Sequence, residues 1–195
     1  MKTPKSIKLV IIATLILSTS LTFKSYSQQY YLNNSNSELK VFGTSNIHDW
    51  HINIEEQKGF IIINKTDNLT ISKLKIEVVA ESLKSGKKGM DKNTYKALDT
   101  ENYKTITFQI NEIKNTSKIA DNKYKVETNG NLTISGVTKK MPLQFNLSLV
   151  NNEVHLSGEK IIKMTDFNIE PPKALFGTIT TGDEVTIKFN STFNN

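Results

Sequence analysis

The stretch Tyr124–Ile134, "YKVETNGNLTI", has two possible readings, and the choice between them decides the fold. Asn129 and Gly130 at its centre are among the strongest two-residue signals for a β-hairpin. A hairpin would give two short strands, whereas an uninterrupted strand would be roughly 12 residues, or ~40 Å, long. Long, bent strands are typical of a barrel, where curvature must be accommodated.

The apolar residues of this stretch distinguish the two readings. Cross-strand partners share a face, so a hairpin would place Leu132 and Ile134 opposite the face that carries Tyr124 and Val126. In one uninterrupted strand all four side chains share a face, because side chains alternate with a period of two. We therefore predict a single strand, in which Gly130 marks a bend or a close approach rather than a reversal.

Four other segments alternate between apolar and polar residues, which favours antiparallel strands with one apolar face. Turn signals at Gly136, Asn151 and Gly182 separate strands at spacings typical of an all-β sandwich or barrel. The interval 82–103 lacks the alternation, and we predict a short helix near Met90–Leu98. The alternating apolar positions are Leu74, Ile76, Val78 and Ala80; Ile106, Phe108 and Ile110; Met141, Leu143, Phe145, Leu147 and Leu149; and Val185, Ile187 and Phe189.

The N-terminal segment 1–27 has the three parts of a secretory signal peptide. A lysine-bearing start precedes the apolar run Leu9–Phe23, which is shorter than the ~20 residues that a membrane span needs. Ser25 and Ser27 then have the spacing of a signal-peptidase site. We predict cleavage after Ser27, which leaves one domain at 28–195 in the periplasm or outside the cell, without a stable membrane span.

The basic charge of the chain is largely a property of this segment. The whole chain carries a formal net charge of +6, but four lysines and no acidic residue precede residue 28, so the remainder carries +2. Nucleic-acid binders concentrate basic charge on one face, and we expect no nucleic-acid partner. The chain has no cysteine, so packing and backbone pairing must hold the domain together.

The polar faces of the predicted strands carry many lysines and glutamates, as at Lys73, Lys75 and Glu77. A transmembrane barrel turns apolar residues towards lipid, so these strands must turn their apolar faces inward and their charges to water. A barrel of about eight strands either fills its interior with side chains or holds one small ligand. The residues alone leave both possibilities open.

Four stretches carry a resemblance to a known family, and together they span nearly the whole of 28–195 in order. They resemble the YceI-like family of secreted bacterial proteins, described as lipid- or polyisoprenoid-binding. The resemblance implies an extended, lipocalin-like antiparallel barrel with a short helical insertion, whose lumen holds a long isoprenoid or a similar amphiphile. The stretches are "GTSNIHDW" (43–50), "MDKNTYKALDTENYKTITF" (90–108), "GNLTISGVTKKMPL" (130–143) and "MTDFNIEPPKALFGTITTGDEVTIKF" (164–189).

Two of the three histidines flank the only tryptophan, in "TSNIHDW" and the residue after it. If 47–54 is a strand, His48 and Trp50 share the apolar face, whereas His51 points to the other side. The two histidines then do not chelate one ion, and we predict no metal site and no cofactor. His48 is either a core histidine or a polar group that positions a ligand in the lumen.

The leading hypothesis is non-catalytic binding, transport or sequestration of a long-chain isoprenoid or similar amphiphilic lipid. The alternatives are a cell-envelope hydrolase or isomerase that uses His48, and a ligand-free structural or adaptor barrel. Lys84, Lys87 and Lys88 are candidate head-group contacts, with a solvated basic loop as the alternative reading. No catalytic residue is assigned. The predicted lumen residues are His48, Trp50, Ile52, Leu74, Ile76, Val78, Phe108, Leu132, Ile134, Phe145, Leu147 and Phe189.

Overall fold

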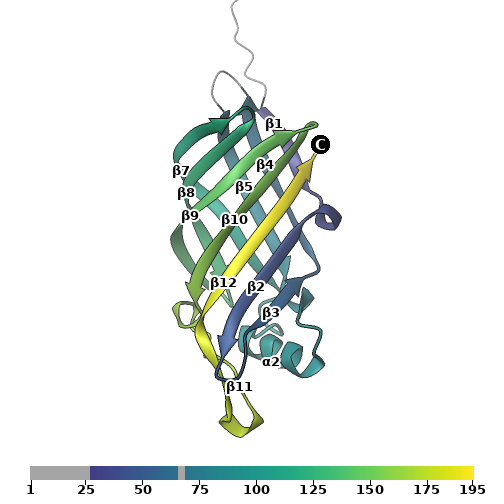
Figure 1. Cartoon of the computed structure of the whole chain (residues 1–195), viewed down its shortest axis with the longest axis vertical. Coiled ribbons are helices and arrows are strands. Elements are labelled where there is room, and N and C mark those ends of the chain that lie inside the picture. The colour runs from purple at the N-terminus through teal and green to yellow at the C-terminus, as the bar shows by residue number, and fades with distance from the viewer. Residues whose placement is uncertain (1–26, 66–68) are drawn as a thin grey trace, which may run out of the picture.

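Eight antiparallel strands pair in a closed ring, in the order β1, β4, β5, β7, β8, β9, β10 and β12, and β12 pairs back with β1. The computed structural model describes residues 27–65 and 69–195, so the predicted signal peptide lies almost wholly outside the described residues. The ring, together with the one α-helix found in these two ranges, confirms the predicted all-β barrel (Figure 1). The strands are β1 (Ser27–Leu32), β2 (Glu38–Ser45), β3 (Trp50–Ile54), β4 (Gln57–Lys65), β5 (Leu69–Val79), β6 (Leu83–Lys84), β7 (Thr105–Ala120), β8 (Lys123–Ile134), β9 (Val137–Val150), β10 (Glu153–Lys163), β11 (Lys173–Ala174) and β12 (Ile179–Asn194).

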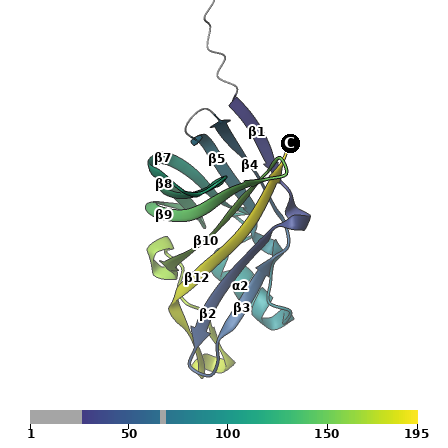
Figure 2. The same cartoon turned by 45° about the horizontal axis from the view of Figure 1, so that its top comes forward.

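The long strand β12 changes its partner part-way along the barrel. Near its C-terminal end it pairs with β1 through Leu32 and Tyr31, and from Asn190 towards its start it pairs with β2. The short 3-10 helix η1 (Asn34–Asn36) separates β1 from β2 at the point of this exchange. The ring is therefore closed at the end where β12 pairs with β1, and we call this the closed end. Towards the other end β2, β3 and β6 continue the sheet beside β12, and β2 and β3 are labelled there in Figure 2.

The strand β8 settles the question posed by its sequence. It is one uninterrupted strand, paired with β7 on one side and with β9 on the other. A Cβ atom at Gly130 would overlap the ring of Phe108, so a glycine is needed for the close approach of the two strands. The register of β7 against β8 shifts between Ile110 and Glu112, directly beside Gly130, which marks the predicted bend.

The turn predicted at Gly182 is wrong, because this residue lies inside β12. The register between β12 and β2 shifts between Thr181 and Val185, so extra residues of β12 are accommodated as a bulge rather than as a reversal. The turns predicted at Gly136 and Asn151 are confirmed as the β8–β9 and β9–β10 hairpins.

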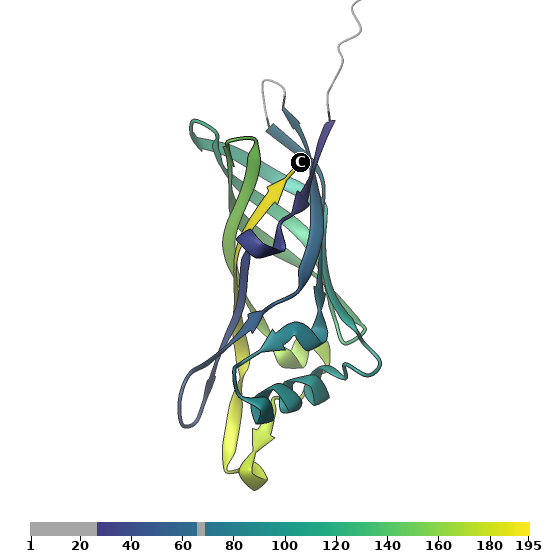
Figure 3. The same ribbon diagram turned by 90° about the vertical axis from the view of Figure 1, so that its right-hand side faces the viewer.

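The predicted helix is confirmed as α2 (Lys88–Leu98), which lies at the end of the barrel away from β1 (Figure 3). Its side chains Met90, Ala97 and Leu98 pack against the inward faces of the strands. The hydroxyl of Tyr95 lies 2.9 Å from the carbonyl oxygen of Glu81, which ties the helix to the segment after β5. The helix thus covers part of the open end.

The closed end of the barrel is filled by side chains. A cluster of buried residues from β1, β4, β5, β8, β9, β10 and β12 occupies it without a large cavity, as protein interiors normally do. Two smaller clusters lie towards the α2 end, where partly buried side chains predominate. The residues of the closed-end cluster are Tyr30, Ile61, Ile63, Leu69, Ile71, Leu74, Val126, Phe145, Leu147, Leu149, Val154, Leu156 and Phe193.

Candidate ligand-binding cavity

A cavity of about 950 Å³ occupies the α2 end of the barrel. This volume lies near the upper end of the range found for small-molecule sites. Inward side chains of the strands form its wall, and α2 forms another side. It reaches the surface at a mouth lined by the β2–β3 turn, by α2 and by the loop that contains η4 (Leu175–Gly177).

The structure brings most of the predicted lumen residues to this one cavity. The exception is Leu147, which is 1% exposed and packs within the closed-end cluster without bordering the cavity. Its strand β9 runs past the inner end of the cavity, so its inward side chains change from cavity wall to packed core along one strand. The predicted residues that border the cavity are His48, Trp50, Ile52, Leu74, Ile76, Val78, Phe108, Leu132, Ile134, Phe145 and Phe189.

The predicted strand position of His48 is wrong. The strand β3 begins only at Trp50, and His48 lies in the preceding turn with its side chain exposed. The turn forms because Ser45 donates its backbone N–H and its hydroxyl to the carbonyl oxygen of His48, at 3.0 and 2.7 Å. The Nδ1 atom of His48 lies 2.8 Å from the carbonyl oxygen of Asp49. His48 therefore belongs to the rim of the mouth and not to the interior.

Trp50 is a fixed part of the cavity wall. Its indole Nε1–H donates to the carbonyl oxygen of Thr44 at 3.0 Å. A Cβ atom at Gly43, the cross-strand partner of Trp50, would overlap the indole ring. The absence of a side chain at Gly43 therefore lets the ring lie flat against β2. The contact with the indole ring explains why position 43 is a glycine, which the sequence pattern did not reveal.

The charged residues that border the cavity are lysines, and no aspartate or glutamate among residues 27–65 and 69–195 joins them. Of the predicted head-group contacts only Lys87 borders the cavity. The ammonium group of Lys84 instead lies 2.5 Å from the hydroxyl of Tyr95, and this hydrogen bond raises the pKa of Lys84. Lys92 and Lys173 border the mouth and were not predicted.

A fourth lysine, Lys160, was also missed. It borders the cavity from β10, where Val154, Leu156 and Ile162 occupy the same inward-facing alternation and are buried. The signal was present in the sequence, because extending the period of Val154 and Leu156 by two further steps reaches Lys160. The side chain thus places a positive charge on a wall that is otherwise mainly apolar.

Gln57 is the most unusual polar residue of the cavity wall. It is 5% exposed and shares the inward face of β4 with Ile61 and Ile63. Its Nε2 atom is buried and has no hydrogen-bond partner among the described residues. Its backbone N–H donates to Oδ1 of Asn34 at 3.0 Å, which places Gln57 beside η1. No sequence signal identified it.

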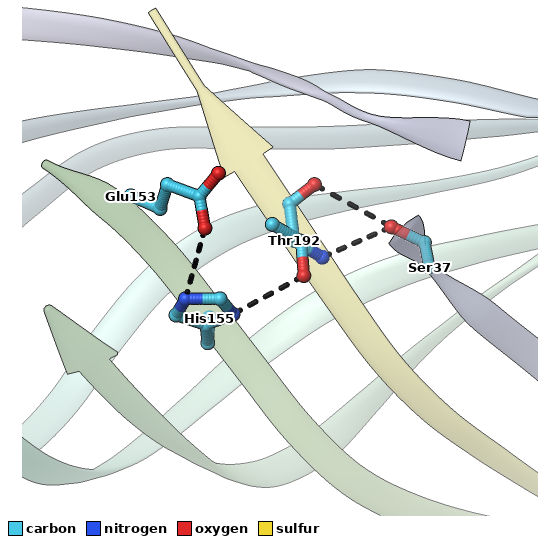
Figure 4. Close-up of polar contacts among 4 residues, drawn as sticks. All are labelled: Ser37, Glu153, His155 and Thr192. Atoms are coloured by element: carbon cyan, nitrogen blue, oxygen red, sulfur yellow. Dashed lines mark hydrogen bonds and ion pairs between the residues drawn. The ribbon is translucent and has the colours of Figure 1, made fainter. Parts of the chain in front are cut away.

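The third histidine takes part in a polar network on the outer side of the barrel (Figure 4). His155 Nδ1 lies 3.1 Å from the hydroxyl of Thr192, and its Nε2 lies 3.4 Å from the carboxylate of Glu153. The backbone N–H of Thr192 donates to the hydroxyl of Ser37 at 2.9 Å. Thr192 is buried and does not border the cavity, so the network closes the seam where β12 passes from β1 to β2.

Two kinds of feature are absent from the described part of the chain. No group of three or more His, Cys, Asp or Glu side chains there is arranged to hold a metal ion. No helix in the same residues combines the length and apolar character required to cross a bilayer.

Comparison with known proteins gives one family and one fold. The model of the YceI-like domain matches residues 30–193. No curated protein matches the chain by sequence. The solved structure of BcnA from Burkholderia cenocepacia shares 18% identity with a TM-score of 0.66, covering 83% of this chain and 98% of that one.

Two other solved structures have the same fold. A polyisoprenoid-binding domain from Saccharophagus degradans, implicated in plant cell wall breakdown, shares 14% identity with a TM-score of 0.67, covering 85% of this chain and 97% of that one. The YCEI protein of Campylobacter jejuni shares 18% identity with a TM-score of 0.55, covering 74% and 84%. With a family model that spans nearly all of the barrel, the chain belongs to the YceI-like family.

Proposed function

We propose that this chain binds one long apolar or amphiphilic lipid, of the isoprenoid class, in the cavity at the α2 end. It carries or sequesters this guest without chemical change, in the periplasm or outside the cell. The observation that carries the proposal is a cavity of about 950 Å³ with a mainly apolar wall, at one end of a barrel whose other end is tightly packed. The name of the Saccharophagus degradans domain, a polyisoprenoid-binding domain, supports the choice of guest.

The driving force would be the burial of the guest's hydrocarbon chain. Removing apolar surface from water contributes about 25 cal/mol per Å², and this term is not directional. A smooth wall of branched and aromatic side chains, such as Ile76, Phe108 and Ile187, accepts a flexible chain without demanding one conformation. The site thus selects for length and apolar character more than for fine structure.

The lysines give the mouth a preference for one kind of head group. Lys87, Lys92 and Lys173 surround it, and a phosphate, pyrophosphate or carboxylate at the end of the lipid would be attracted to them. Lysine acts as a mobile point charge, which suits a head group that is partly solvated. We assign these three side chains the role of head-group contacts, in place of the set Lys84, Lys87 and Lys88.

The other two hypotheses have less support. A ligand-free adaptor barrel requires a filled interior, and the α2 end is not filled. An acid–base enzyme requires His48 to face a reacting group inside the cavity, but His48 lies in an exposed turn at the rim. Substitution of His48 by Ala is expected to leave guest binding within about twofold of the original protein.

The decisive experiment is extraction of the gently purified protein, mass spectrometry of the extract, and titration of the delipidated protein with isoprenoids of graded length. The variant Ile187→Trp places a large ring in the cavity and should abolish binding. The neighbouring variant Thr186→Trp points to the other face of β12 and should bind normally. The absence of retained lipid together with the absence of titratable binding would overturn the proposal.

A further inference from the structure

The mouth of the cavity carries three large apolar side chains that face water. Phe176 is fully exposed, Leu175 is 68% exposed, and Ile47 on the β2–β3 turn is 58% exposed. All three border the cavity, so they surround its opening rather than lie elsewhere on the surface. The loop that follows β11 forms the extreme end of the molecule in Figures 1 and 3.

The backbone holds the two residues of this loop in a strained conformation. Leu175 has φ of +48° and Phe176 has φ of +56°, a region that bulky residues rarely adopt. Such strain persists only where the surrounding structure determines it, and it clusters at functional sites. The loop is also held at its base, because Lys173 and Ala174 pair with β12. The apolar side chains are thus presented to solvent by a defined structure.

Hydrogen bonds of the Asn46 side chain connect the β2–β3 turn, which carries Ile47, to the loop that carries Leu175 and Phe176. The amide of Asn46, next to Ile47, donates from Nδ2 to the carbonyl oxygen of Thr178 at 2.9 Å. Its Oδ1 accepts the backbone N–H of Thr180 at 3.0 Å. Because this one amide bonds to two residues that follow η4, the β2–β3 turn and the C-terminal side of the loop keep a fixed relative position.

The charged side chains that border the cavity beside Ile47, Leu175 and Phe176 are all positive. Lys87, Lys92 and Lys173 border the mouth, whereas Asp49 on the β2–β3 turn does not. Lys173 has an exposed partner in Glu170 at 3.6 Å, a contact of little strength in water. Exposed apolar side chains beside lysines are the combination that binds to the interface of an anionic membrane.

We propose that the mouth docks on an anionic lipid bilayer, with Ile47, Leu175 and Phe176 inserted among the head groups. Docking would align the cavity with the membrane from which the guest is taken or to which it is given. This inference rests on the proposed lipid-binding function. A bilayer fits better than a protein partner, because three projecting side chains form no flat patch of the ~800 Å² that a stable protein interface buries on each side.

The test is co-sedimentation of the processed protein, residues 28–195, with vesicles of phosphatidylethanolamine and phosphatidylglycerol, at low and high salt. The original protein should bind, and salt should weaken the binding. The variant Leu175→Ser/Phe176→Ser should lose about tenfold or more in partitioning, because it removes two inserted side chains. The matched control is Ile119→Ser/Val150→Ser at the opposite end, whose residues are 57% and 46% exposed and which should bind normally.

Each outcome has one meaning for the docking surface. Failure of the original protein to bind vesicles, or equal loss in both variants, would overturn the inference. A dimer in solution that the loop variant dissociates would also overturn it, since the tip would then be an interface between copies. Isoprenoid titration of the original protein in solution separates this inference from the function on which it rests. Failure of the original protein to bind isoprenoid would refute the function. Failure to bind vesicles by a protein that still binds isoprenoid would overturn the docking alone.

Discussion

Replacement of Gln57 by methionine is expected to stabilise the empty protein. The buried Nε2 atom of Gln57 has no partner among the described residues, and an unsatisfied buried polar group costs about 1–3 kcal/mol. Methionine has a similar length and no hydrogen-bond donor, so the variant removes this cost while it keeps the wall of the cavity. Each kcal/mol should raise the melting temperature by about 2–4 °C for a domain of this size.

Calorimetry of the delipidated protein measures this effect, and Gln144→Met, on an exposed position of β9, is the matched control with no expected change. Gln57→Met should also lower the affinity for a guest that carries an oxygen near residue 57. Relative to the affinity for a hydrocarbon of equal length, the loss should be about 2- to 10-fold. A fall in stability of 1 kcal/mol or more for Gln57→Met would refute the reasoning, since it would mean that the amide is satisfied in the empty protein.

Three further predictions concern the rest of the barrel. Leu147→Ala should lower the free energy of unfolding in denaturant by about 2–5 kcal/mol, with little effect on guest binding, because Leu147 packs in the closed end; a cost below 1 kcal/mol would contradict a packed core there. Gly43→Ala should displace the Trp50 ring, cost about 1–3 kcal/mol, and shift the fluorescence of the only tryptophan; an unchanged spectrum would contradict the wall position of Trp50. Hydrogen bonds from Thr165 hold the pKa of the Asp183 carboxyl below its usual range. The stability that these bonds contribute is therefore fully present at pH values above the ordinary aspartate pKa of about 3.9. It is lost as the pH falls through the lowered pKa of the folded state. Asp183→Asn should flatten this part of the stability–pH curve, and thermal unfolding followed across acidic pH checks it.

Much of the barrel could be predicted because strand alternation is a local property. The phase of apolar residues identified one face of each strand, and this was enough to place β8 as a single strand and to select most of the cavity wall. The same rule would have found Lys160 if it had been followed to the end of β10. The missed lysines of the mouth, Lys92 and Lys173, lie on the helix α2 and on the two-residue strand β11, and neither a helix nor so short a strand shows the alternation.

The errors arose where backbone hydrogen bonds override the alternation. His48 was assigned to a strand, but the contacts of Ser45 turn the chain before β3 begins. Gly182 was assigned to a turn, but Thr181 before it and Val185 after it both pair with β2, which keeps Gly182 within β12 as part of a bulge. In both cases the deciding partner lies outside the pattern of side chains, so composition and spacing could not reveal it.

The sequence by itself determined an antiparallel barrel with an apolar interior, its helical insertion and its family, because these follow from short-range patterns and motifs. Only the tertiary structure decided which part of that interior is hollow. Leu147 and Phe145 are successive inward residues of β9, yet Phe145 borders the cavity and Leu147 does not. The difference depends on the distance between opposite walls, which is set by the exchange of β1 for β2 along β12 and by the position of α2. That distance is a property of the closed ring as a whole, and no single strand encodes it.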